Sequence, residues 1–153
     1  MSWKPASLVL IADHQFPADN GPVHPAELRS AIAYGGMTAA EAIERLCEAT
    51  ARAVRPFEGP GRALVAHLFS LLPKIGIDEA MIPDPLLDDL AKRIAHAGAL
   101  TEVNEKWSCP SPRTMTALAR AGVTMVAGSD SHHYRDIGVY DRWVRPTASA
   151  ARA

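Results

Sequence analysis

Short apolar runs alternate with longer amphipathic stretches along this chain. The four apolar runs occupy residues 7–12, 63–66, 99–104 and 123–127. Their length and continuity are typical of strands that are buried on both faces of a sheet. A segment rich in Pro, Gly and Asn, residues 16–25, follows the first run and is predicted to be a loop.

Apolar residues at helical spacing fill the intervals between these runs. A capping box formed by Thr38 and Glu41 starts one helix, and proline near the first turn marks the start of two others. The expected helices lie at residues 25–34, 38–54, 84–96 and 111–121, with a last short one at residues 137–143.

Strands and helices in this order predict parallel strands joined by right-handed crossovers. The 153 residues are enough for one domain with a core and too few for two. Since no linker divides the chain, we expect one α/β domain over residues 1–146 and a disordered Ala/Ser-rich tail over residues 147–153.

Composition and charge exclude several classes of function. Hydrophobic residues make up 48% of the chain and charged residues 22%, as in an ordinary globular protein. The formal net charge of -1 offers no attraction to an anionic membrane and argues against long nucleic acid as a partner. Cys47 and Cys109 suggest no disulfide framework, and we expect neither a leader nor a membrane span. A cytoplasmic location is therefore predicted.

Polar residues follow each predicted strand. They are Asp13-His14, His67, Glu102-Val-Asn104-Glu105-Lys106 and Asp130-Ser131-His132-His133. Because the carboxyl ends of parallel strands meet at one edge of a sheet, we expect these side chains to converge. Histidine and aspartate bind the divalent metals that activate water in hydrolases. The pattern predicts a shared metal site, although an Asp-Ser-His segment after an apolar run is also found in ordinary turns.

Cationic side chains near the same edge are candidates for holding a phosphate group. Lys106, Arg113 and Arg135 lie in or beside the loops that follow the strands. Arginine suits this role because its guanidinium group binds phosphate through two parallel hydrogen bonds. His133, next to His132, is a candidate for substrate contact. Solvated surface charge is the alternative for each of these cations, and simple exposure is the alternative for His133.

Three segments carry a resemblance to a known family. They are Leu64-Val-Ala-His67-Leu, Glu102-Val-Asn104-Glu105-Lys106-Trp107, and Gly128-Ser-Asp130-Ser-His132 continued by Asp136-Ile-Gly138. Together they resemble the PHP-domain family, the polymerase and histidinol phosphatase superfamily, over roughly residues 8–141. The resemblance implies a distorted TIM-type (β/α)7 barrel, with up to three divalent metal ions at the carboxyl ends of its strands and phosphoesterase activity.

Carried over by position, the resemblance makes His14, His67, Asp130 and His132 metal ligands. Asn104 and Glu105 are implied to line the pocket without binding metal. Zinc, manganese and iron all accept such a ligand set. The substrate would be a small phosphorylated molecule.

One part of the family pattern has no counterpart. The family's opening His-x-His pair, acidic residue, further histidine and bridging glutamate would all lie before His14. Four strands do not close a barrel, and an eight-unit barrel takes about 250 residues. We therefore expect a partial (β/α)7-type barrel with its N-terminal units missing, as from a truncated or split gene.

Three functions are weighed on this basis. The first is metal-dependent phosphate ester hydrolysis by the complete protein. The second is a catalytically incomplete PHP module that acts as a scaffold or as one half of a partner-assembled site. The third is an amidohydrolase-like metal hydrolase, whose last barrel strand also ends in aspartate; the second donor in Asp-x-His favours PHP over it. A partial barrel also leaves the strand at residues 7–12 without a neighbour on one side, which predicts self-association through that edge.

Overall fold

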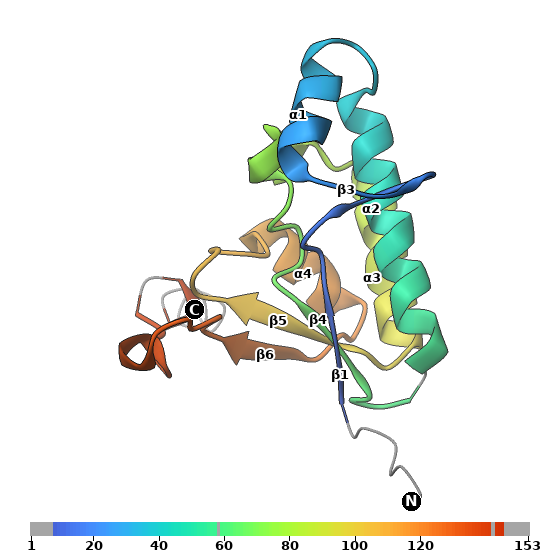
Figure 1. Cartoon of the computed structure of the whole chain (residues 1–153). Coiled ribbons are helices and arrows are strands. Elements are labelled where there is room, and N and C mark those ends of the chain that lie inside the picture. Colours follow the sequence, from blue (N-terminus) through green and yellow to red (C-terminus); the bar gives the residue numbers. More distant parts are fainter. Residues whose placement is uncertain (1–7, 58, 142, 146–153) are drawn as a thin grey trace, which may run out of the picture.

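The computed structural model describes residues 8–57, 59–141 and 143–145. Four strands form a sheet in the order β1-β4-β5-β6, and every neighbouring pair is parallel (Figure 1). The strands are β1 (Val9–Ala12), β4 (Ala63–Ala66), β5 (Leu100–Asn104) and β6 (Met125–Gly128). The predicted parallel α/β architecture is confirmed.

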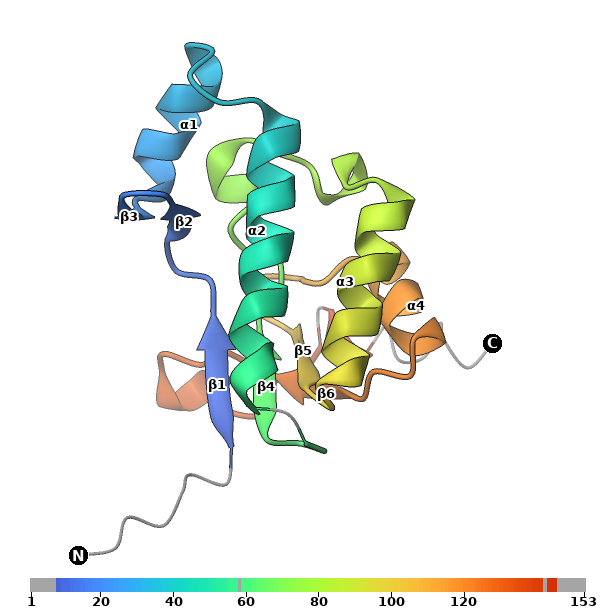
Figure 2. The same ribbon diagram turned by 90° about the vertical axis from the view of Figure 1, so that its right-hand side faces the viewer.

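One helix follows each of the first three strands of this sheet. These are α2 (Ala39–Val54), α3 (Asp84–His96) and α4 (Pro112–Arg120), and a further helix, α1 (Pro25–Ala33), precedes α2. Since the strands are added in one direction, crossovers of the same hand place all connecting helices on one face. Figures 1 and 2 show α2, α3 and α4 together on that face. No helix of the described residues is long and apolar enough to cross a membrane.

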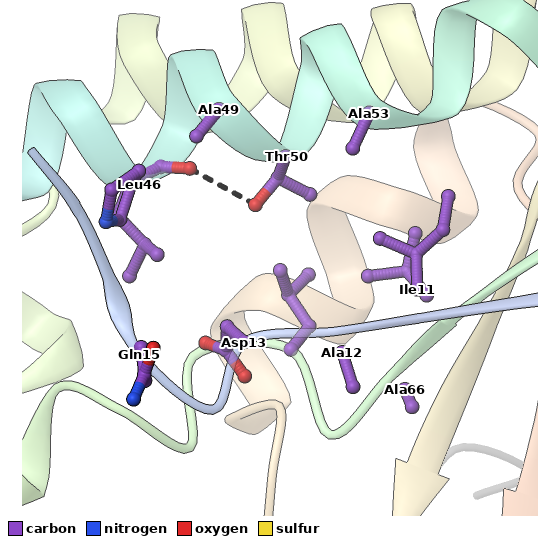
Figure 3. Close-up of a pocket in the computed structure, with 12 residues that line it drawn as sticks. Ile11, Ala12, Asp13, Gln15, Leu46, Ala49, Thr50, Ala53 and Ala66 are labelled. Atoms are coloured by element: carbon purple, nitrogen blue, oxygen red, sulfur yellow. Dashed lines mark hydrogen bonds between the residues drawn. The ribbon is translucent and has the colours of Figure 1, made fainter. Parts of the chain in front are cut away.

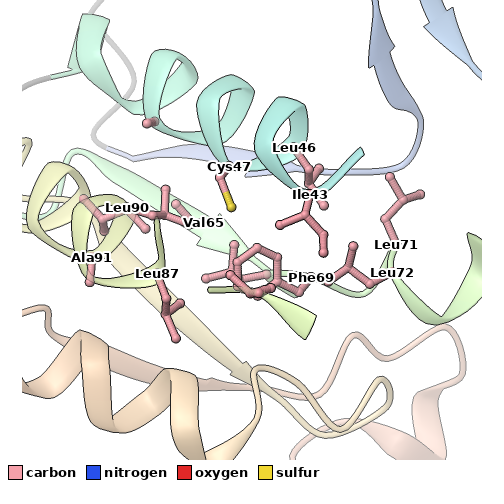
Figure 4. Close-up of a cluster of buried hydrophobic side chains, with 14 of the residues drawn as sticks. Ile43, Leu46, Cys47, Val65, Phe69, Leu71, Leu72, Leu87, Leu90 and Ala91 are labelled. Atoms are coloured by element: carbon pink, nitrogen blue, oxygen red, sulfur yellow. The ribbon is translucent and has the colours of Figure 1, made fainter. Parts of the chain in front are cut away.

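The hydrophobic core lies between the sheet and these helices (Figure 4). The amphipathic face of α2 contributes Ile43, Leu46 and Cys47, which are buried together with residues of α3 and β4. Burial raises the pKa of the Cys47 thiol to about 12, so Cys47 is an inert core residue.

The opposite face of the sheet has a different character. Leu10, Leu64 and Leu100 align across three neighbouring strands on that face. Leu10 is 63% exposed, while Leu64 and Leu100 are half-buried. The sheet therefore buries one face under helices and leaves an apolar stripe on the other.

Several predicted boundaries need correction. Residues 16–25 contain a hairpin of β2 (Phe16–Ala18) and β3 (Gly21–Val23), held in place because the Phe16 side chain is buried in the core. The predicted helix at residues 137–143 is absent over its described residues, 137–141 and 143. Gly138 has a φ of 75°, which is incompatible with a right-handed helix. Ser7 of the first predicted strand and the predicted tail, residues 147–153, lie outside the described residues.

The predicted capping box at the start of α2 is confirmed and gives a first testable expectation. Thr38 Oγ1 accepts a hydrogen bond from Glu41 N at 3.2 Å, and Thr38 N donates to Glu41 Oε2 at 2.8 Å. We expect Thr38→Ala to lower the free energy of unfolding by about 1 kcal/mol, measured by urea denaturation. Thr116→Ala is the matched control, because the Thr116 hydroxyl bonds the Pro112 carbonyl within α4 and caps no helix end. An equal loss in both variants would contradict a capping role.

Candidate functional site

The residues that follow the strands lie at one edge of the sheet, as the parallel topology requires. Asp13 and His14 follow β1, His67 follows β4, Lys106 and Trp107 lie beyond β5, and Asp130 to His132 lie beyond β6. Their contacts divide them into two groups, one centred on His67 and the other on Asp130.

The first group is buried and centred on His67, which is 4% exposed. Its Nδ1 lies 3.1 Å from Asp13 Oδ1, and since a carboxylate only accepts, this nitrogen carries the proton. The His14 ring lies beside it, with a centroid distance of 5.1 Å. The hydrogen bond to Asp13 raises the pKa of His67; burial opposes the increase, and the charges of Asp13, Glu102 and Asp130 add to it.

This arrangement leaves the second ring nitrogen of His67 available. No hydrogen bond joins Nε2 to any other described residue. A histidine that donates Nδ1–H to a carboxylate and presents Nε2 is the usual form of a metal-bound imidazole. Asp13 therefore fixes the tautomer and the orientation that a metal ligand needs.

The same contacts exclude a Ser-His-Asp nucleophile. Ser70 Oγ lies 2.9 Å from His67 Nδ1, the nitrogen that already faces Asp13. A nucleophilic serine must contact the opposite ring nitrogen, so that the imidazole can pass the charge to the carboxylate. Ser70 is also only 3% exposed, which keeps substrate from its hydroxyl.

The second group surrounds the Asp130 carboxylate. Trp107 Nε1 donates to Asp130 Oδ2 at 2.7 Å, and Lys106 Nζ lies 3.5 Å from the same oxygen. Lys106 Nζ also lies 2.8 Å from His132 Nδ1, so its ammonium group sits between Asp130 and His132. Burial raises the pKa of Asp130, but the Trp107 hydrogen bond and the positive charges of Lys106, His132 and His67 outweigh it and lower the pKa overall.

A cavity of about 200 Å³ opens beside this second group. It is lined by Glu105, Lys106, Ser129, Asp130, Ser131, His132, Asp136 and Val139. Four of the predicted site residues, Glu105, Lys106, Asp130 and His132, thus share one pocket.

The backbone is strained at both groups. Among the described residues, four that are not glycine have positive φ: His67 (34°), Phe69 (70°), Ser108 (51°) and Asp130 (45°). Each lies in a loop that follows β4, β5 or β6. Left-handed non-glycine residues persist only where the surroundings impose them, and they cluster at functional sites. Two of these four are predicted ligands.

Three further predicted site residues have hydrogen-bond partners outside these two groups. Arg113 is engaged elsewhere, because its guanidinium group pairs with Asp84 and donates to the Ile82 carbonyl at 2.7 Å. Arg135 lies in the exposed turn Tyr134–Asp136, and His133 directly precedes that turn. His133 Nδ1 accepts a hydrogen bond from Arg135 N at 3.2 Å. The hydrogen bonds given above do not connect His133 or Arg135 to Asp130.

Glu105 and Asn104 have structural partners within the loops. Glu105 Oε2 accepts from Trp143 N at 2.9 Å and from Val144 N at 2.8 Å, which ties the C-terminal segment to the end of β5. Asn104 is fully buried and bonds Trp107 N through its side-chain oxygen at 2.9 Å. Glu105 lines the cavity as predicted, whereas Asn104 is not among the lining residues.

A second cavity, of about 180 Å³, lies between β1 and α2 (Figure 3). Its wall is mostly alanine, leucine and isoleucine side chains, with Asp13 and Gln15 toward one end. The Thr50 hydroxyl, which also faces it, donates within α2 to the Leu46 carbonyl at 2.9 Å. This cavity offers apolar volume and no group of charges that could hold a phosphate.

The donors fit part of a metal site. Within the described ranges, no three His, Cys, Asp or Glu side chains converge on one point. A catalytic zinc ion takes three protein ligands and one open position. His67 with His14 supplies one pair of donors, Asp130 with His132 supplies another, and Lys106 places a positive charge beside the second pair. Imidazole and carboxylate donors suit a divalent cation. The set is incomplete, and the Lys106 ammonium group must move from between Asp130 and His132 before a cation can bind that pair.

Sequence reasoning missed three residues that shape the site. Asp13 was visible as the acid directly after β1, and its pairing with a histidine 54 residues away was not. Trp107 was named only within a segment that carries the resemblance, and its hydrogen bond to Asp130 was not predicted. Glu102 could have been singled out, because an acidic residue within an otherwise apolar buried strand needs a specific partner.

Comparisons of this chain with known protein families, with curated proteins and with solved structures find no match. The function proposed for it therefore depends on the residues at the carboxyl edge of the sheet and on their geometry.

Proposed function

We propose that this chain is part of a PHP-like, metal-dependent phosphoesterase and supplies part of its metal site. The observation that carries the proposal is the buried His67, which is held by Asp13 through Nδ1, has its Nε2 unengaged and lies beside His14. The Asp130–His132 pair stands at the same edge of the sheet, as the resemblance implies for metal ligands.

The fold supports a partial barrel. In a (β/α) barrel, consecutive parallel strands curve around an interior that side chains fill, and the helices lie outside. The sheet of this chain has its strands in consecutive order, its helices on one face and an apolar stripe of leucines on the other. Further strands would close the barrel over that stripe.

Each residue has a defined task in this proposal. His14, His67, Asp130 and His132 would hold divalent ions such as zinc, manganese or iron, and a bound ion supplies an activated water and a Lewis acid. Asp13 orients His67, and Trp107 orients Asp130. Lys106 borders the cavity and can pair with an oxygen of a small phosphorylated substrate.

A second candidate function has a specific observation in its favour. This function is that of a catalytically incomplete module. The observation is that no three metal-binding side chains converge among the described residues, and a catalytic zinc site needs three. The chain would then bind metal weakly, and catalysis would require donors from another polypeptide segment.

Metal titration is the test of the proposal. We expect Mn²⁺ or Zn²⁺ to bind the wild-type chain, measured by isothermal titration calorimetry at neutral pH. His67→Ala and Asp130→Ala should each weaken binding by at least 10- to 100-fold, the loss that outer-shell partners alone can cause. His96→Ala is the matched control, since His96 lies in the last turn of α3 at the other edge of the sheet.

Phosphatase turnover separates the two candidates. Metal-dependent hydrolysis of p-nitrophenyl phosphate that is lost in Asp130→Ala supports the phosphoesterase. Metal binding without turnover supports the incomplete module. Affinity that is unchanged in both His67→Ala and Asp130→Ala would contradict the ligand assignment.

A further inference from the structure

A chain of hydrogen bonds, buried at Glu102 and Asn104 and exposed at its Trp107–Asp130 end, joins the two groups of the site through β5. Glu102 Oε2 accepts from His67 N at 2.7 Å and from Asn104 Nδ2 at 2.9 Å. Asn104 Oδ1 accepts a hydrogen bond from the backbone N–H of Trp107. The indole Nε1 of the same tryptophan donates to Asp130 Oδ2. The path therefore runs from the backbone of one predicted ligand to the carboxylate of another.

Strand geometry places this network on the face of the sheet that carries no helices. Alternate residues of a strand share a face, so Glu102 and Asn104 lie on the same side as Leu100. Glu102 is only 9% exposed and Asn104 is fully buried. Burying a carboxylate is unfavourable unless hydrogen bonds compensate, and the two donors to Oε2 provide that compensation.

Gly128 makes the room that Glu102 needs. It ends β6, next to Asn104 on β5, and a Cβ atom at this position would lie 1.6 Å from Glu102 Oε1. Only glycine allows the carboxylate to lie this close to the neighbouring backbone. The glycine of the Gly-Ser-Asp sequence is therefore required because any larger side chain would clash with the Glu102 carboxylate.

The network acts on two strained residues. His67 holds a φ of 34° with its N–H bound to Glu102, and Asp130 holds a φ of 45° with its carboxylate bound to Trp107. We infer that Glu102 and Asn104 are positioning residues that couple His67 to Asp130. The link to metal binding rests on the proposed function, whereas the coupling itself can be measured without metal.

Four variants test the coupling. Glu102→Ala removes the acceptor, and Gly128→Ala displaces the same carboxylate without changing it. Glu102→Gln is the conservative variant, because its amide oxygen can accept both hydrogen bonds in place of Oε2. Gly36→Ala is the matched control, since a Cβ there meets its nearest atom, the Ala31 carbonyl oxygen, at 3.4 Å.

The first readout is the chemical shift of the Trp107 indole N–H and the exchange rate of the His67 amide, both measured by nuclear magnetic resonance on the metal-free protein. We expect the Trp107 indole N–H to move upfield and the His67 amide to exchange about tenfold faster, or more, in both Glu102→Ala and Gly128→Ala. Glu102→Gln and Gly36→Ala should keep the wild-type values. The inference is overturned if the two disruptive variants fold and leave both signals in place, or if Glu102→Gln is perturbed as strongly as Glu102→Ala.

Two further measurements keep the inference testable. If the disruptive variants do not fold, amide exchange in the wild-type protein tests the inference. The His67 and Trp107 amides should then be protected from exchange as strongly as the amides of the strands. Exchange at the rate of an unprotected amide would overturn the inference. In metal titrations, Glu102→Ala and Gly128→Ala should weaken affinity about 10- to 100-fold while Gly36→Ala does not. A wild type that binds no metal would contradict the proposed function, and the metal-free signals would still decide the coupling.

Discussion

Replacing Phe69 by alanine is expected to lower the free energy of unfolding by about 3–5 kcal/mol. Phe69 is 2% exposed, and Figure 4 shows its ring among the core side chains beneath α2 and beside α3. Removing the ring forfeits its burial and leaves a cavity that close-packed neighbours fill only in part. The φ of 70° offers no compensation, because alanine is also disfavoured there.

Urea denaturation followed by circular dichroism measures this loss. Tyr34→Ala is the control, since Tyr34 is 90% exposed and its removal should change the free energy of unfolding by less than about 0.5 kcal/mol. A loss below about 1 kcal/mol in Phe69→Ala would show that the loop after β4 is not anchored in the core.

The position of Phe69 links the core to the site. His67 and Ser70 flank it in the same loop, and both contact Asp13. Because the Phe69 ring is fixed among core side chains, the short segment before it has little freedom to move. The orientation of His67 therefore depends on core packing as well as on its hydrogen bonds.

Local signals in the sequence were sufficient for most of the helices and strands. β4 occupies the predicted residues 63–66, because an apolar run bounded by a Gly-rich turn and a histidine leaves little choice of register. α2 begins where the Thr38 capping box places it. The placement of His67 and Asp130 at the same edge of the sheet also followed from sequence, since parallel strands bring their carboxyl ends together.

Features that depend on distant partners could not be predicted in the same way. The β2–β3 hairpin looked like a loop because Pro17 and Pro22 hide its strand character, and it is fixed by the burial of Phe16. Arg113 was a phosphate candidate from its place beside the loop after β5. Its actual partner, Asp84, is 29 residues away at the start of α3. Such pairings are set by helix packing, which a single sequence does not show.

The β1 edge of the sheet is expected to mediate self-association. Within the described residues, β1 pairs with β4 on one side only. Leu8 and Leu10 on and beside it are 45% and 63% exposed. An apolar edge strand with free backbone donors and acceptors is a template for pairing with another chain.

Leu10→Lys should weaken this association, since burying a leucine side chain contributes about 1.5–3 kcal/mol. Because about 1.4 kcal/mol corresponds to tenfold in affinity, the dissociation constant should rise about 10- to 100-fold. Sedimentation velocity over a concentration series measures the dissociation constant. Tyr34→Lys, at the C-terminal end of α1, is the control for added charge. Folding should be retained, because Leu10 lies on the face without helices and contributes little to the core. A wild-type chain that stays monomeric at every concentration, or equal weakening by Tyr34→Lys, would show that the β1 edge is not the interface.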